Sequence, residues 1–278
     1  MQPLLADDVF TWGRFGRRVL FLSTRQALRL GGFAAARPLG AAMAALHYRF
    51  GRATRRQCQQ DLARLLGRDA ADPLVKRTLR EAYRVNTRAV LEVLSMVDRQ
   101  LDAATLQSRC HTEGLHHLEA ARTGRGAILL ATHSGNSLLL AAQLAQNGVP
   151  VTVVYRHARM VDALRHNRVL FAMVDQGVRQ AETGLEMEFL GKRMPMPGGV
   201  MQLARQTRAP IVPVEAVAAD PVWRFQMHAP LVFQPGGTLE QDMAILLRET
   251  ERQILAHPQL WSWQQRRWRG FAMAGDEA

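Results

Sequence analysis

The stretch AILLATHSGNS, residues 127–137, decides the fold of this chain. Its first five residues are all apolar, which is typical of a strand buried on both faces of a sheet. Residues 132–137 are mostly polar and predict a turn, and the apolar residues 138–146 predict a helix. Strand-to-helix turns of this kind carry ligand sites in open α/β sheets, because they face a crevice beside a helix N-terminus.

The segments after this stretch extend it into a β-α-β unit. Asn147-Gly148 ends the predicted helix, and residues 151–155 form a second apolar run. Further strands are expected at 169–174, 185–190, 211–217 and 222–228, with helices over 199–206 and 238–256. This order predicts an α/β fold with a mostly parallel central sheet, right-handed crossovers and flanking helices.

The N-terminal part of the chain predicts helices alone. Asp72-Pro73 fits an N-cap followed by proline at the first helical position, and it opens a helix that is expected to reach Val97. Residues 27–50 are rich in Ala, Gly and Leu but contain arginines and a proline, which favours two helices lying at an interface. We expect a helical layer over 1–110 and an α/β core over 111–278, folded as one cooperative domain.

Composition limits the class of protein. The formal net charge is +12 and nearly all of the cationic side chains are arginines, which suits anionic partners such as a membrane surface, nucleic acid or an acidic carrier protein. Genomic codon bias is the alternative explanation. The chain has two cysteines, Cys58 and Cys110, far apart in the sequence. We therefore expect neither a disulfide framework nor a structural zinc site. Neither a signal peptide nor an uninterrupted membrane span is expected.

His133, in the turn after the first strand, is the leading candidate for catalysis. A histidine there can take a proton from a hydroxyl, and it can also simply cap the helix. Ser134 is a poor candidate for a nucleophile because its surroundings lack the G-x-S-x-G elbow. His111, His116 and His117 lie in a segment that we interpret as an amphipathic helix, and their spacing matches no familiar metal site.

The C-terminal segment, residues 258–271, interleaves three tryptophans with arginines. Such a pattern suits a membrane interface, where amphipathic rings lie among headgroups. It also suits stacking on nucleic acid bases. The third interpretation is that the tryptophans pack on the domain and the arginines face solvent.

Six blocks in order resemble the bacterial lipid A biosynthesis acyltransferase family, within the lysophospholipid acyltransferase superfamily. The blocks are 127–136, VTVVYR at 151–156, Val174-Asp175-Gln176, 188–191 ending in Gly191, 199–213, and PQLWSWQQRRWR at 258–269. The resemblance spans about residues 15–270. It implies a glycerolipid acyltransferase-like fold.

The resemblance implies that His133 is the general base in the family's HxxxxD/E motif. This chain has Leu138 where the motif has its acid. Asp175 or Glu215 could replace that acid, the acceptor could be an amine or an acidified hydroxyl that needs a weaker base, or the chain could be a non-catalytic member. Asp175 and Glu215 both lie near predicted strand ends, so we prefer the first explanation.

A second departure is a short stretch between Arg156 and Val169, where family members have a longer helical segment with another arginine. Arg165 or Arg168 could take its place. We expect Arg156, Asn136, Gln176 and Gly191 to bind substrate, with no metal and no cofactor.

The resulting hypothesis is an acyltransferase at the cytoplasmic face of the bacterial inner membrane. It would move an acyl chain from an acyl carrier protein or acyl-coenzyme A thioester onto a glycolipid or other amphiphilic acceptor. The anionic membrane surface and the acidic carrier fit the positive charge. The alternatives are a scaffold that binds lipid or carrier, and nucleic-acid binding, for which no fold motif is present.

Overall fold

The computed structural model describes residues 12–98, 102–152, 157–178 and 184–265. A six-stranded sheet in the order β1-β8-β7-β2-β4-β3 lies at its centre. All neighbouring strands in this sheet are parallel except β7 and β8. Its strands are β1 (Cys110–Glu113), β2 (Ala127–Ala131), β3 (Val151–Thr152), β4 (Val169–Met173), β7 (Ile211–Ala218) and β8 (Trp223–Met227). The predicted α/β fold with a mostly parallel sheet is therefore confirmed.

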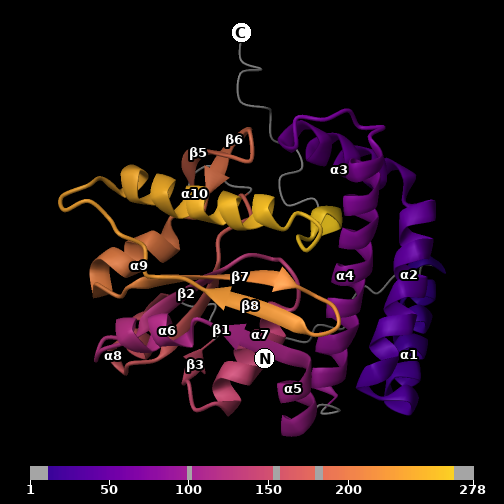
Figure 1. The fold of residues 1–278 in the computed structure, drawn as a ribbon, viewed down its shortest axis with the longest axis horizontal. Helices are drawn as coiled ribbons and strands as arrows, with labels where there is room; N and C mark the ends of the chain where they lie inside the picture. Colours follow the sequence, from indigo (N-terminus) through magenta and orange to yellow (C-terminus); the bar gives the residue numbers. More distant parts are fainter. Residues whose placement is uncertain (1–11, 99–101, 153–156, 179–183, 266–278) are drawn as a thin grey trace.

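Helices cover both faces of this sheet. Figure 1 shows α10 on one side of it and α7 on the other, with α1, α2 and α4 at one end. The helices are α1 (Trp12–Gly31), α2 (Ala36–Phe50), α3 (Arg52–Leu65), α4 (Pro73–Val97), α5 (Ala103–Arg109), α6 (Leu115–Ala121), α7 (Ser137–Gln146), α8 (His157–Arg165), α9 (Gly199–Thr207) and α10 (Leu239–Ala256), with short 3₁₀ helices at Phe33–Ala35 and Trp263–Gln265.

The central strand β2 explains why two hydrophobic cores form. All five of its residues are buried. Ile128 and Leu130 pack into a core with α9 and α10, whereas Leu129 packs into a second core with α7. Successive side chains of a strand point to opposite faces, so an uninterrupted apolar run is what a strand covered on both faces requires.

The N-terminal helices begin and end where local chemistry favours it. The Asp72 side chain accepts a hydrogen bond from the Leu74 backbone N–H at 2.7 Å, and Pro73 follows as the first helical residue of α4. Gly40 on α2 permits close approach to α4, since a Cβ at this position would lie 3.0 Å from the Arg88 Cα. Among the described residues, no helix combines the length and apolarity needed to cross a bilayer.

Several elements differ from the sequence-based expectation or add to it. Residues 110–113 form strand β1, whereas an amphipathic helix was expected there. The expected strand at 185–190 is β5 (Leu185–Phe189), and it pairs with β6 (Lys192–Met196) in a separate antiparallel hairpin. Helix α8 occupies the short stretch before β4. Only two residues of the expected strand at 151–155 are described as β3, because residues 153–156 lie outside the described ranges.

Candidate functional site

The candidate site lies where two neighbouring parallel strands end. β2 pairs with β4 so that Ala131 is opposite Met173. The chain continues from β2 into His133 and from β4 into Asp175, and both loops therefore emerge at the same edge of the sheet. This is the edge at which open α/β sheets bind their ligands.

The side chains of His133 and Asp175 form a pair at this edge. The His133 Nδ1 lies 2.6 Å from the Asp175 Oδ1, and the backbone N–H of His133 donates to the Asp175 Oδ2 at 2.9 Å. Asp175 is fully buried, whereas about a third of the His133 side chain is exposed. Because Nδ1 is engaged with the carboxylate, Nε2 is the ring nitrogen left for a substrate.

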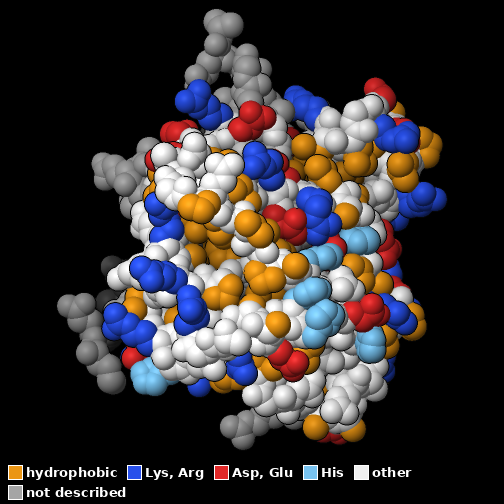
Figure 2. Space-filling model, turned by 60° about the vertical axis from the view of Figure 1, so that its left-hand side comes forward, with side chains coloured by type: hydrophobic (Ala, Val, Ile, Leu, Met, Phe, Trp, Pro, Cys, Tyr) orange, Lys and Arg blue, Asp and Glu red, His pale blue; other side chains and the backbone are white. Residues whose placement is uncertain are grey.

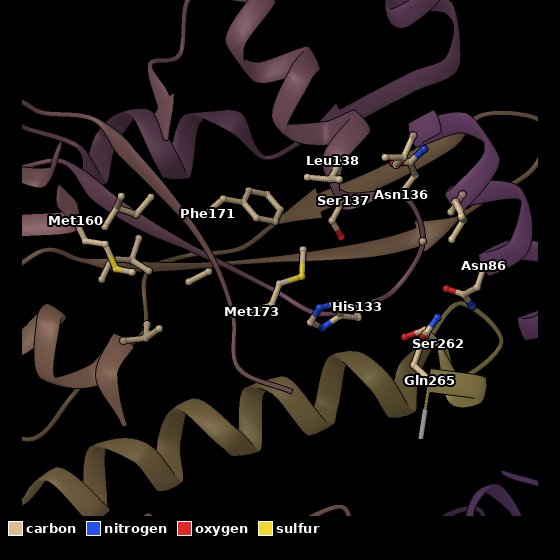
Figure 3. A pocket seen from close by; sticks show the side chains of 18 of the residues that line it. Asn86, His133, Asn136, Ser137, Leu138, Met160, Phe171, Met173, Ser262 and Gln265 are labelled. Atoms are coloured by element: carbon tan, nitrogen blue, oxygen red, sulfur yellow. The ribbon is translucent and has the colours of Figure 1, made fainter. Parts of the chain in front are cut away.

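A pocket of about 610 Å³ opens beside His133. Figure 3 shows His133 at its centre, with Phe171 and Met173 on one side and Asn86 and Ser262 on the other. Its apolar walls come from α4, α7, α8, β4 and α9, through Ala89, Val90, Val93, Leu138, Met160, Leu170, Phe171, Ala172, Met173, Val200 and Leu203. A mostly apolar cavity with a few polar groups is the usual form of a small-molecule binding site.

Leu138, at the position of the motif acid, lies in the first turn of α7 and lines this pocket. Its side chain is 41% exposed. The carboxylate beside His133 therefore comes from Asp175, which follows a different strand.

Asn136 lines the pocket and holds the start of α7. Its Oδ1 accepts a hydrogen bond from the Leu139 backbone N–H at 3.0 Å, and its Nδ2 donates to the Glu92 Oε2 at 2.9 Å. The indole N–H of Trp223 donates to the same Glu92 oxygen at 2.6 Å. Burial raises the pKa of Glu92 above its usual range, while Arg88 and the two donors oppose that shift. Asn136, which we expected to bind substrate, therefore caps α7 and also bonds the buried Glu92.

Glu215, the second candidate for the acid, is engaged elsewhere. Its Oε1 lies 2.8 Å from the His228 Nε2, and its Oε2 lies 3.3 Å from Arg252 on α10. This pair resembles the His133–Asp175 pair in composition, but neither Glu215 nor His228 lines the pocket described above.

The remaining predicted residues have separate locations. Gly191 has a positive φ of 70° in the turn between β5 and β6, and the adjacent Leu190 N–H donates to Glu251 on α10. Gln176 is exposed directly after Asp175. Arg156 lies outside the described residues, and the structure does not place it.

Two tryptophans of the C-terminal segment are buried. Trp261 and Trp263 are 1% and 2% exposed, and the rings contact each other edge to face. The indole N–H of Trp261 donates to the Asp175 Oδ2 at 2.7 Å. The packing interpretation holds for these two side chains, whereas Trp268 lies outside the described residues. The tryptophan-rich composition was the only sequence signal for this contact, and it did not indicate the partner.

The part of the chain that the structure describes contains no cluster of side chains suited to binding a metal ion. No group of three or more His, Cys, Asp or Glu side chains there is arranged to hold a metal ion. His116 and His117 stack on each other, and His111 lies 3.8 Å from Glu113.

On the face drawn in Figure 2, the cationic side chains are scattered and do not form a single patch. On the face in Figure 2, Lys and Arg side chains lie around a central area of hydrophobic side chains, with acidic side chains among them.

Comparison of the sequence with known proteins identifies the family of this chain. The sequence profile described as bacterial lipid A biosynthesis acyltransferase matches residues 14–160 and 158–270. The chain is 30% identical over 252 residues to a phosphatidylinositol mannoside acyltransferase of Mycobacterium tuberculosis (strain CDC 1551 / Oshkosh), covering 76% of each chain. It is 24% identical over 255 residues to the enzyme of the same name from Mycolicibacterium smegmatis (strain ATCC 700084 / mc(2)155), covering 76% of this chain and 79% of the relative.

Among solved structures, the 1-acyl-sn-glycerophosphate acyltransferase PlsC from Thermotoga maritima aligns with a TM-score of 0.36 and 14% identity, over 78% of this chain and 95% of that one. The family profile covers most of this chain, and the mycobacterial relative matches three quarters of it. The chain therefore belongs to the bacterial lipid A biosynthesis acyltransferase family, whose members are acyltransferases that act on lipids.

Proposed function

We propose that this protein transfers an acyl chain from a thioester donor to a hydroxyl of an amphiphilic lipid, with His133 as the general base. The observation that carries the proposal is the 2.6 Å contact between the His133 Nδ1 and the Asp175 Oδ1, together with the position of His133 in the lining of an apolar pocket. A carboxylate at Nδ1 fixes the tautomer and orientation of the imidazole and stabilises the imidazolium.

The reaction follows from this geometry. The His133 Nε2 takes the proton of the acceptor hydroxyl, and the oxygen attacks the thioester carbonyl. The tetrahedral intermediate collapses by breaking the carbon–sulfur bond, and the leaving thiolate takes the proton from the imidazolium. The products are an ester and a free thiol. Helix α7 begins at Ser137 in the pocket wall, and its positive end favours the negative charge that develops on the carbonyl oxygen.

The apolar pocket supports an acyl chain as the group transferred. Residues of α4 and β4 form its walls, and among them Val93, Phe171 and Met173 have no group that could hydrogen-bond a polar substrate through the side chain. The donor in this proposal is an acyl carrier protein or acyl-coenzyme A, both of which are anionic and fit a chain of net charge +12.

The acceptor in this proposal is a glycolipid. Relatives carry the name phosphatidylinositol mannoside acyltransferase, and the family description names lipid A. Both are amphiphiles with sugar hydroxyls, which is the acceptor chemistry that a histidine base requires.

We further propose that the protein works at the cytoplasmic face of the inner membrane as a peripheral protein. Four consecutive apolar residues of α1, from Val19 to Leu22, are each between 45% and 57% exposed. Consecutive residues point in different directions around a helix, so most sides of this helix are uncovered there. An exposed apolar helix flanked by arginines is typical of attachment to an anionic membrane.

The test is acyl transfer by the purified protein with palmitoyl-coenzyme A and, in parallel, palmitoyl-loaded acyl carrier protein. Phosphatidylinositol mannoside and a lipid A precursor serve as the acceptors, and mass spectrometry detects the acylated product. His133→Ala is expected to lower turnover by about 10²- to 10⁴-fold. His228→Ala is the matched control, because it removes a histidine that is also paired with a carboxylate but does not line the pocket.

Retained turnover within about tenfold in His133→Ala would remove the base assignment. A protein that binds acyl donor and lipid, with no turnover on any acceptor and no effect of His133→Ala on binding, would instead be a scaffold.

A further inference from the structure

The C-terminal segment crosses the loop that carries His133. The Gly135 N–H donates to the Leu260 carbonyl at 2.9 Å, and the Ser262 N–H donates to the His133 carbonyl at 3.1 Å. These bonds flank an antiparallel bridge between Ser134 and Trp261. The backbone of the catalytic loop is therefore held on both sides of Ser134 by residues near the end of the chain.

This crossing segment, residues 260–262, is itself attached to α4. The Asn86 side-chain amide donates to the carbonyls of Leu260 and Trp261, at 3.2 and 3.0 Å. Asn86 is buried, and its amide also donates to the Ala82 carbonyl at 2.8 Å. A buried amide bonded to three carbonyls fixes the position of the segment relative to α4.

The same segment brings an indole N–H to the carboxylate that faces His133. The Asp175 Oδ2 accepts the Trp261 Nε1–H at 2.7 Å and the His133 backbone N–H at 2.9 Å. The other oxygen, Oδ1, faces the His133 ring. Two donors on Oδ2 restrict rotation of the carboxylate about its terminal torsion, which is otherwise broad.

We propose that Trp261 is a positioning residue for acyl transfer, which holds the Asp175 carboxylate so that Oδ1 meets the His133 Nδ1. This inference rests on the function proposed above. Trp261 acts through Asp175 and touches neither the reacting hydroxyl nor the thioester in that mechanism. The C-terminal segment is then part of the catalytic apparatus, although it lies 86 residues from Asp175 in the chain.

The chain supplies a matched control two residues away. Trp263 is buried like Trp261, packs edge to face against it, and donates its indole N–H to the Pro258 carbonyl at 2.7 Å. A Trp→Phe substitution at either position removes one indole N–H and similar apolar area. The two variants differ in whether the lost hydrogen bond ends on the carboxylate.

The kinetic experiment compares Trp261→Phe with Trp263→Phe in the palmitoyl transfer assay. Trp261→Phe is expected to lower kcat roughly tenfold or more with little change in KM, because a displaced carboxylate affects the transition state and not the binding of the acyl chain. Trp263→Phe is expected to change kcat by less than about threefold at a similar melting temperature. Equal kcat losses in the two variants would overturn the proposal.

A double variant separates positioning from general damage. In an Asp175→Asn background, Trp261→Phe is expected to cause no further loss of kcat, because the two side chains act as one unit. Multiplied losses in the double variant would show that Trp261 acts independently of Asp175, and would contradict the proposal.

A spectroscopic measurement tests the contact without any turnover and without a tryptophan variant. The chain has five tryptophans, so ¹⁵N-labelled protein gives five indole N–H signals. Asp175→Asn is expected to shift the Trp261 signal and speed its exchange with solvent at least severalfold, leaving the Trp263 signal in place. An unmoved Trp261 signal would overturn the proposed contact even if acyl transfer is confirmed, whereas a moved signal with no turnover on any acceptor would count against the proposed function alone.

Discussion

The Asp175 carboxylate and the His133 imidazole meet at 2.6 Å, although 42 residues separate them in the chain. β2 and β4 are neighbours and run parallel, so the residues that follow them leave the sheet at the same edge. A carboxylate held this way can perform the task of the motif acid that Leu138 replaces.

We predict that Asp175→Asn lowers turnover nearly as much as His133→Ala, roughly 10²- to 10⁴-fold, because the pair acts as a unit. Glu215→Gln serves as the matched control, since Glu215 is bonded to His228 and Arg252. Its turnover is expected to stay within a few-fold of the wild type. The measurement is steady-state palmitoyl transfer, and the reverse ranking would assign the acid role to Glu215.

We predict that Leu138→Glu does not raise turnover. Restoring the motif acid gives His133 no new partner at Nδ1, because Asp175 already occupies that position. Leu138 lines the pocket, so a carboxylate there also makes the pocket less favourable for an acyl chain. A severalfold gain in kcat would show that the histidine of the native protein lacks effective support.

We predict that Asn136→Ala destabilises the protein by about 2 kcal/mol, from the lost cap of α7 and the lost donor to the buried Glu92. Asn147→Ala, at the exposed far end of the same helix, is the control and is expected to change stability by less than about 0.5 kcal/mol. Urea denaturation measures both. Equal stabilities of the two variants would contradict the role of Asn136 in the buried network.

We predict that the N-terminal helix loses a stabilising contact in acid. Hydrogen bonds from Arg25, and then from Arg29, lower the pKa of Asp98 from 3.8 to about 2. A carboxyl group whose pKa is lower in the folded state contributes stability above its unfolded pKa, and this contribution is lost as the pH falls from about 4 to 2. The difference in unfolding free energy between wild type and Asp98→Asn should therefore shrink across that interval. A difference that is constant with pH would show that the ion pair contributes nothing.

We predict that the protein binds vesicles containing phosphatidylglycerol better than vesicles of phosphatidylcholine alone, and that salt weakens the binding. Leu20→Ser with Phe21→Ser is expected to reduce binding severalfold, since both side chains are about half exposed on α1. Val232→Ser, at an 85% exposed residue between β8 and α10, is the control. Equal binding by all three proteins would remove α1 from the proposed membrane contact.

Some elements of the fold follow from local sequence alone. Asp72-Pro73 starts α4 as predicted, and Thr238 caps α10 by accepting the Gln241 N–H. The apolar run of β2 spans the residues expected. Capping and hydrophobic periodicity depend on residues within one turn or one strand, so the chain shows them without its tertiary context.

Other elements depend on what lies beside them. β5 alternates between partly buried and exposed residues until the buried Phe189, and only its pairing with β6 places it outside the central sheet. The turn between them has positive φ at both Leu190 and Gly191. Turns of this kind usually have Asn-Gly or Asp-Gly, so the sequence Leu-Gly predicts one only weakly. Strand β1 could not be predicted from its own residues, because it is defined by its parallel pairing with β8.

The sequence by itself predicted the turn that carries His133, and it offered Asp175 and Glu215 as candidates for the acid that replaces Leu138. The tertiary structure decided between the two contacts, because the order of the strands sets which loops meet at one edge, and no local pattern encodes that order. It also placed Trp261 on the carboxylate, through a C-terminal segment whose composition fitted three different environments. Contacts between distant segments depend on the whole packed fold, whereas helices, strands and caps depend mainly on neighbouring residues.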